Sequence, residues 1–137
     1  MFKTIMVPVD LEHTEALQTA FSVTGQLADL YGAKVIFVGV SGTFPSAVSK
    51  DAQEFRTKLE ALAQSQRFAQ ISEVSAKPIF THDPSVDLAP ALIQAAEQYG
   101  ADLVIMASHV PGFAEHLISS NAGYVASHAP MSVFVVR

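Results

Sequence analysis

Five short runs of apolar residues alternate along the chain with four longer stretches whose apolar residues recur every three or four positions. The runs fall at residues 5–9, 35–40, 74–80, 103–107 and 133–136. Most of them are rich in valine and isoleucine and apolar throughout, which is typical of strands buried on both faces of a parallel sheet. The run at 74–80 alternates less regularly than the others but is also predicted to be a strand.

The four longer stretches have the spacing of amphipathic helices. They cover approximately residues 17–31, 48–70, 88–99 and 122–129. Thr14 is a candidate N-cap for the first helix, and Gly32 stands where a glycine commonly ends one. Asp83 or Ser85 is suited to cap the third helix. The last helix is predicted to be short, starting near residue 122 and ending before Pro130.

The order of these elements predicts the fold class. Strands separated by helices of this length need crossover connections, which are right-handed in nearly all parallel sheets. We therefore expect an α/β fold, an open parallel sheet of five strands with helices on both faces. No linker, repeat or low-complexity tract interrupts the pattern, so residues 1–137 are predicted to form a single domain.

Composition narrows the possible partners. Of 137 residues, 50% are hydrophobic and 15% charged, which favours a folded core over disorder. The 8 lysines and arginines are dispersed, and 13 acidic residues bring the net charge to -5. Neither nucleic acid nor an anionic membrane surface is therefore expected as a partner. Cysteine is absent and apolar stretches reach only about six residues, so we expect no membrane insertion and a soluble cytoplasmic protein.

Two polar segments lie where a parallel sheet commonly binds ligands, outside the carboxyl ends of its strands. Asp10 ends the first strand, where a carboxylate suits a ribose hydroxyl or a metal-bound water, or serves only as a turn residue. Ser119, Ser120 and Asn121 precede the last predicted helix, whose free backbone N–H groups would attract an anion such as phosphate. The same three residues are also common helix caps, and considered alone they are better explained as caps.

An enzymatic interpretation rests on Asp10, Ser108 and His109, which follow two strands that should be neighbours. Because Ser108 and His109 are adjacent on an extended segment, their side chains should diverge, which disfavours a Ser-His-Asp triad. The chain also lacks the glycine-lysine loop of nucleoside triphosphatases and the G-x-G-x-x-G turn of dinucleotide-binding proteins. Catalysis is therefore the less favoured class of function.

Three segments carry a family resemblance. They are Ile5–Asp10, Gly100–His109 and His128–Arg137, which read IMVPVD, GADLVIMASH and HAPMSVFVVR. Together, in this order and at this spacing, they resemble the universal stress proteins over essentially the whole chain. The resemblance implies a single-domain fold of the adenine nucleotide alpha hydrolase type, with strand order 3-2-1-4-5.

The resemblance also implies a nucleotide site at the carboxyl ends of the first, second and fourth strands. The adenine would contact backbone near the first two strand ends, Asp10 would contact the ribose or a metal-bound water, and the phosphates would contact the loop after the fourth strand. The implied binding residues are Pro8, Val9, Asp10, Val38, Val40, Ser108, His109, Gly112, Ser119, Ser120 and Asn121. The implied ligand is ATP or another adenine nucleotide, with Mg²⁺, and no side chain is assigned as a direct metal ligand.

The phosphate segment departs from the pattern of nucleotide-binding members, which is G-x-x-G, nine residues, then glycine with serine or threonine. The loop before Gly112 looks one residue shorter, His109 and Val110 replace the first glycine, and Ser119 replaces the glycine of the pair. If the backbone at Ser119 requires a positive φ, its Cβ costs about 1 kcal/mol, which weakens a site without abolishing it. Glu12 brings a second negative charge near any triphosphate unless a divalent ion lies between them.

Members of the family commonly form homodimers through the last strand. Its residues here are Val133, Phe134, Val135 and Val136. Left alone, this strand is an apolar edge that pairing with a second copy would cover; the alternative is a strand buried under helices.

Three functions remain open on the sequence. The favoured one is a dimeric stress-response or regulatory module that binds an adenine nucleotide without efficient catalysis, because Ser120 and Asn121 are retained. The second is a dimeric regulatory protein that binds no nucleotide and acts through contacts with an unidentified protein partner. The third is a slow ATPase or small hydrolase.

Overall fold

The computed structural model describes residues 1–66 and 73–108, the backbone of 115–120, and residues 121–137. Strands and helices alternate along the chain, with one 3-10 turn, η1, before the first helix. The elements are β1 (Thr4–Val9), η1 (Thr14–Leu17), α1 (Gln18–Tyr31), β2 (Lys34–Ser41), α2 (Ala52–Ser65), β3 (Val74–Phe80), α3 (Pro84–Gln98), β4 (Leu103–Ala107), α4 (Glu115–His128) and β5 (Ser132–Val136).

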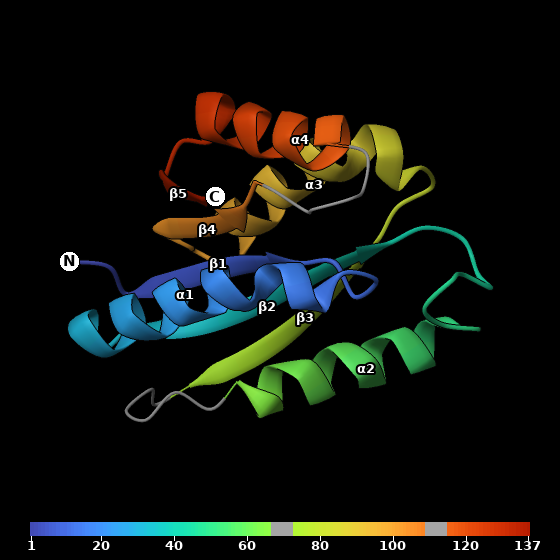
Figure 1. The fold of residues 1–137 in the computed structure, drawn as a ribbon, viewed down its shortest axis with the longest axis horizontal. Helices are drawn as coiled ribbons and strands as arrows, with labels where there is room; N and C mark the ends of the chain where they lie inside the picture. Colours follow the sequence, from blue (N-terminus) through green and yellow to red (C-terminus); the bar gives the residue numbers. More distant parts are fainter. Residues whose placement is uncertain (67–72, 109–114) are drawn as a thin grey trace.

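The five strands form one sheet in the order β3-β2-β1-β4-β5, and all four pairings between neighbours are parallel. Figure 1 shows this sheet between helices that lie on both of its sides. The predicted fold class is confirmed, and so is the strand order that the family resemblance implied. Strand β1 lies at the centre of the sheet. The chain first adds β2 and β3 on one side of it and then β4 and β5 on the other, so the strand order reverses between β1 and β4.

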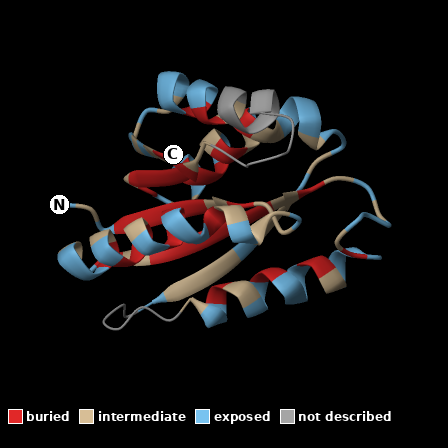
Figure 2. Cartoon of the chain, viewed as in Figure 1, coloured by how far each residue is buried: buried red, intermediate tan, exposed pale blue. Residues whose placement is uncertain are grey.

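Two hydrophobic clusters hold the helices against the sheet. On one face, residues of α1 and α2 such as Phe21 and Leu59 pack with Ile5 and Phe37. On the other face, residues of α3 and α4 pack against Met6, Ile36 and Val104, among others. Figure 2 shows the buried residues concentrated in the central strands and on the inward sides of the helices. The period-2 alternation of strand side chains between faces explains why Ile5 and Met6 belong to different clusters.

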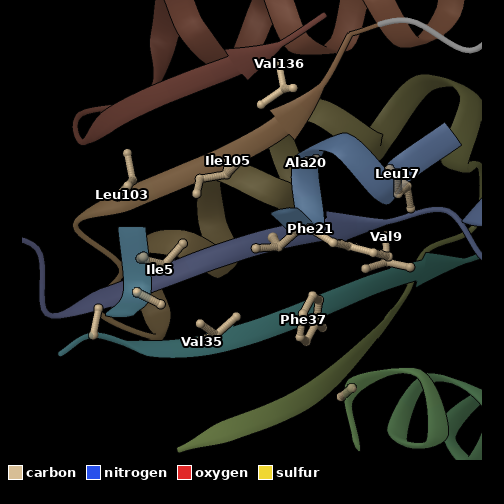
Figure 3. Close-up of a cluster of buried hydrophobic side chains, with 14 of the residues drawn as sticks. Ile5, Val9, Leu17, Ala20, Phe21, Val35, Phe37, Leu103, Ile105 and Val136 are labelled. Atoms are coloured by element: carbon tan, nitrogen blue, oxygen red, sulfur yellow. The ribbon is translucent and has the colours of Figure 1, made fainter. Parts of the chain in front are cut away.

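The first of these clusters extends to the end of the sheet where β1 finishes. Figure 3 shows Phe21 of α1 beside the sheet and Leu17 and Val9 near the carboxyl end of β1. The rings of Phe21 and Phe37 meet edge to face with centroids 5.6 Å apart, a favourable aromatic geometry. The core therefore supplies a rigid apolar base for whatever lies at that end.

Helix boundaries differ from the sequence predictions in three places. The first α-helix begins at Gln18, after η1, and Thr14 provides no side-chain cap. Helix α2 is shorter than predicted, beginning at Ala52 with Asp51 as its cap. Helix α4 begins at Glu115, seven residues before the predicted start. In contrast, Asp83 caps α3 as predicted.

The amino end of the sheet is closed by short turns. Gly32 and Gly100 have φ values of 63° and 67° and lie at the ends of α1 and α3. Asp102 accepts hydrogen bonds from the backbone N–H groups of Lys3 and Thr4, with its closest contact at 2.9 Å. Within the part of the chain that the structure describes, no helix is both long and apolar enough to cross a bilayer.

Candidate functional site

A pocket of about 330 Å³ opens at the carboxyl end of the sheet. The predicted residues that line it are Pro8, Val9, Asp10, Val38, Val40 and Asn121. They come from β1 and the residue after it, from β2, and from α4. The ends of β1 and β2 meet here because parallel strands end at the same edge of the sheet. The volume lies within the range of small-molecule sites.

The other predicted site residues are not placed in this pocket. Ser108 directly follows β4, and its backbone N–H donates to the carbonyl of Val136 at 2.8 Å; it extends the pairing of β4 with β5 and does not line the pocket. His109 and Gly112 lie outside the described residues. Ser119 and Ser120 belong to α4, but their side chains are also outside the description.

The prediction that Ser119, Ser120 and Asn121 start the last helix is wrong. Because α4 begins at Glu115, the backbone N–H groups free to bind an anion are those of its first four residues, and the groups from Ser119 onward are used within the helix. Serine and asparagine are poor guides here, since they occur at caps and, less often, inside helices. The apolar spacing of Ile118 with Ala122 and Val125 was the available signal for an earlier start.

The loop after β1 folds back on Asp10. One carboxylate oxygen, Oδ1, accepts the N–H of Glu12 at 2.9 Å, and the other, Oδ2, lies 2.8 Å from Nδ1 of His13. The backbone N–H of His13 also donates to the carbonyl of Asp10 at 3.1 Å. Asp10, Glu12 and His13 all line the pocket, so the loop brings an acid pair and an imidazole to its wall.

His13 was missed by the sequence analysis as a site residue. Five histidines are scattered along the chain, and none of them stands in a recognised metal-binding or catalytic motif. The contact between Asp10 and His13 depends on the turn between them. Their separation of three residues directly after a strand end was the only available signal. Asp10 thus contacts the imidazole of His13 in its own loop, whereas His109 lies outside the described residues.

Most of the pocket wall is apolar and comes from helices as well as strands. Phe55 enters from α2, and Leu88 and Leu92 enter from α3. All three lie within the helical stretches predicted at 48–70 and 88–99, where the spacing of apolar residues does not distinguish burial in the core from exposure to a pocket. Gly42 also lines the pocket, and a Cβ there would lie 2.9 Å from Cδ of Pro84, so the loop after β2 packs closely on the start of α3.

The charge of the pocket is negative. Its ionisable lining residues, within the described part of the chain, are Asp10, Glu12 and His13, and no lysine or arginine lines it. A phosphate group entering the pocket would therefore meet two carboxylates and no basic side chain from these residues. Binding an anionic ligand here requires a cation, backbone donors, or both.

Comparison with known proteins identifies the family. The model of the universal stress protein family matches residues 1–137. The chain belongs to the universal stress protein family. Universal stress protein G of Escherichia coli O157:H7 is 29% identical over 142 residues that cover 100% of both chains. The family resemblance predicted from the three sequence segments is confirmed.

Solved structures of universal stress proteins share the fold. One, in complex with cAMP, has a TM-score of 0.71 at 20% identity and covers 99% of this chain and 97% of its own. Another, from Archaeoglobus fulgidus and in complex with dAMP, has a TM-score of 0.66 at 16% identity, covering 98% of each chain. At these identities the likeness establishes the fold of this universal stress protein, and the ligands named belong to those two proteins.

Proposed function

We propose that this protein binds an adenine nucleotide in the pocket at the carboxyl end of the sheet. We further propose that it does so as a cytoplasmic homodimer with a regulatory role, without efficient catalysis. The observation that carries the proposal is the pocket itself, lined by Pro8, Val9 and Asp10 of the first strand end and by Val38 and Val40 of the second. These are the positions that the family resemblance assigned to the adenine and ribose.

The walls of the pocket suit a flat, partly apolar base. Val40 of β2, Leu92 of α3 and Phe55 of α2 offer apolar contact area, while the backbone of the strand ends offers hydrogen-bonding groups. The half-exposed carboxylate of Asp10 is held by the N–H of Glu12, so it is already oriented to accept a hydrogen bond from a sugar hydroxyl. Two universal stress proteins of the same fold have been solved with adenine nucleotides.

The negative charge of the pocket wall disfavours binding of the phosphate groups of a nucleotide. Asp10 and Glu12 would repel a triphosphate, and no lysine or arginine among the described lining residues offsets them. A divalent cation between carboxylates and phosphates removes this repulsion. The proposed ligand is therefore a nucleotide with its metal ion, such as Mg²⁺ with ATP, or a nucleotide of lower charge such as AMP.

The dimer is proposed from the free edge of β5. Among the strands that the structure describes, β5 pairs with β4 alone, and Phe134 on it remains 44% exposed. An edge strand that exposes an aromatic side chain is a liability in an isolated domain, and antiparallel pairing with a second copy would cover it. The family resemblance suggests the same strand as the interface.

A second function is favoured by one specific observation, the position of Ser119 inside α4. If the free N–H groups of that helix do not face the pocket, the phosphate site inferred from Ser119, Ser120 and Asn121 is lost. The protein would then act as a dimer through contacts with another protein, without a nucleotide.

Calorimetric titration with ATP and AMP, in the presence of Mg²⁺, tests the proposal. Thermal melts give a second readout, because a ligand at 100 times its Kd stabilises the folded state by about 2.7 kcal/mol. The variant Asp10→Asn should weaken binding by roughly tenfold, or about 1.4 kcal/mol, whereas the exposed Asp29→Asn in α1 is the matched control and should bind like wild type.

If neither nucleotide binds at millimolar concentration, the proposal fails and the second function is favoured. Native mass spectrometry of the same sample measures the mass of the assembly and of any nucleotide carried through purification. A monomer at micromolar concentration would contradict the proposed dimer.

A further inference from the structure

Three potential metal ligands occupy four consecutive positions after β1. The side chains of Asp10, Glu12 and His13 each offer one ligand atom, and these atoms all lie within 4.8 Å of one another. In the part of the chain that the structure describes, this is the one such group of three or more histidine and acidic residues. All three residues also line the pocket, so an ion bound there would face its contents.

The loop backbone explains why the three groups converge. The turn closed by the N–H of His13 on the carbonyl of Asp10 returns the chain toward the strand end. The carboxylate of Asp10 is oriented through Oδ1 by the N–H of Glu12, which leaves Oδ2 beside the imidazole of His13 at 2.8 Å. Glu12 is exposed and can rotate inward at little cost.

The distances allow an ion after a small closing movement. Zinc ions bind imidazole nitrogen at about 2.0–2.1 Å and carboxylate oxygen at about 2.0–2.2 Å. Two ligand atoms on one ion are therefore roughly 3.0–3.5 Å apart, which the pair of Asp10 and His13 nearly satisfies already. Rotation of the Glu12 side chain would supply the third contact.

Charge and chemistry select the class of ion. The two carboxylates have no lysine or arginine beside them among the described residues of the pocket wall, so a divalent cation would be attracted. Magnesium prefers a shell made of oxygen atoms, whereas imidazole nitrogen is a ligand that suits Zn²⁺ and related first-row ions. A set of one nitrogen and two oxygen ligands therefore points to a transition ion.

We infer that Asp10, Glu12 and His13 form a binding site for a divalent transition-metal ion at the wall of the pocket, with Zn²⁺ bound more tightly than Mn²⁺ and both more tightly than Mg²⁺. The order of affinity follows the general preference of mixed nitrogen and oxygen sites. Three protein ligands leave at least one coordination position for water or for an oxygen of a bound ligand.

A consequence for the nucleotide rests on the proposed function. An ion at this site would neutralise the carboxylates that otherwise repel phosphate, and its open position would face the pocket. Nucleotide affinity should then rise when Zn²⁺ or Mn²⁺ is present without Mg²⁺.

Calorimetric titration of ZnCl₂ and MnCl₂ into chelator-treated protein, without nucleotide, tests the site. We expect one ion per chain and a loss of affinity of about tenfold or more in Glu12→Gln and in His13→Gln. The matched controls are Glu15→Gln, three residues further along, and His128→Gln, whose ring stacks on Tyr124 at the end of α4. Both controls should bind like wild type.

The inference is overturned if no ion binds, or if the two site variants bind as tightly as the two controls. A parallel titration with AMP, with and without Zn²⁺, separates it from the proposed function. Zinc binding that depends on Glu12 and His13, with no nucleotide binding, would support the metal site and reject the proposed function. Nucleotide binding by a protein that takes up no metal ion would do the reverse.

Discussion

The two ends of the sheet use the same kind of residue for different purposes. At the amino end, Asp102 accepts three hydrogen bonds from the N–H groups of Lys3 and Thr4, nearly a hundred positions away in the chain. At the carboxyl end, the hydrogen bonds that Asp10 makes within the described part of the chain join it to Glu12 and His13 of its own loop. A carboxylate with distant backbone partners ties strands together, whereas one with local partners leaves the sheet unaffected and faces the pocket.

The turns and helix caps also differ between the amino and carboxyl ends of the sheet. At the amino end, α1 and α3 end on Gly32 and Gly100, and the following N–H groups of Ala33 and Ala101 return to the carbonyls of Ala28 and Ala96. At the carboxyl end, α2 and α3 begin instead with the side-chain caps Asp51 and Asp83. The loop before α2 and the first residue of α3, Pro84, help to line the pocket. The amino end therefore maintains the fold, and the carboxyl end is free to vary in function.

Substitution of the two aspartates should give the largest difference. Asp102→Ala removes the acceptor of the Thr4 N–H, and Thr4 is buried, so we expect a loss of about 2 kcal/mol of unfolding free energy. Asp10→Ala leaves the strand pairing intact and should cost less than about 1 kcal/mol. Urea denaturation followed by circular dichroism measures both.

The exposed Asp29→Ala is the control for removing a negative charge and should change the unfolding free energy by about 0.5 kcal/mol or less. Equal losses in Asp102→Ala and Asp10→Ala would break the comparison, because they would show that the loop after β1 also holds the sheet together. The comparison also fails if Asp102→Ala weakens ligand binding in the folded protein.

This division also explains how far the sequence could predict the molecule. The strands were predictable because apolar runs such as Val35–Val40 must be buried on both faces, and that requirement is local. The place of Asp10 at the pocket wall was predictable because it follows a strand where the strand order reverses. The role of the turn that joins Asp10 to His13 could not be predicted, because it depends on backbone torsions that the residue types do not determine.

The start of the last helix was predicted wrongly for a different reason. Ser119, Ser120 and Asn121 have the composition of a cap, but a cap and a polar helix interior differ only in what precedes them. The apolar spacing of Ile118 with Ala122 and Val125 in the sequence was the available signal for the longer helix. Phe55 and Leu92 show a related limit, since an apolar side chain that lines a pocket has the same helical spacing as one that fills the core.

The glycines at the amino end should give the next largest effect. Gly32→Ala and Gly100→Ala put a Cβ on a left-handed residue, where the space is open but the torsion is unfavourable, so each should cost about 1 kcal/mol. Gly123→Ala is the matched control within α4, where the space is also open and φ is not positive. It should stabilise the protein by up to about 1 kcal/mol, because alanine favours a helix.

Thermal unfolding of the three glycine variants measures this difference in sign. If Gly32→Ala and Gly123→Ala shift the melting temperature in the same direction, the amino-end turns are not set by the torsion of their glycines. A loss confined to Gly100→Ala would place the constraint in the connection to β4 alone.

The smallest effect concerns a cap at the carboxyl end, where α2 begins. The N–H of Lys50 donates to Glu54 at 3.0 Å, and the ammonium group of Lys58 lies 3.2 Å from the same carboxylate. The hydrogen bond from Lys50, followed by the contact with Lys58, lowers the pKa of Glu54 below its ordinary value of 4.5. The folded protein therefore binds this proton less tightly than the unfolded chain does, and the cap stabilises the fold fully above pH 4.5.

That contribution should disappear as the pH falls below 4.5 and through the lowered pKa of Glu54. Glu54→Gln should therefore be slightly less stable than wild type at pH 7, and the difference should narrow toward acid pH. The control Glu60→Gln changes an exposed residue of the same helix that makes no hydrogen bond or ion pair in the described part of the chain, so it should unfold close to wild type at pH 7. Urea midpoints between pH 7 and pH 3 measure both. A constant difference for Glu54→Gln would mean that the side-chain cap acts without its charge, and the contrast with the uncharged glycine turns of the amino end would then be one of geometry alone.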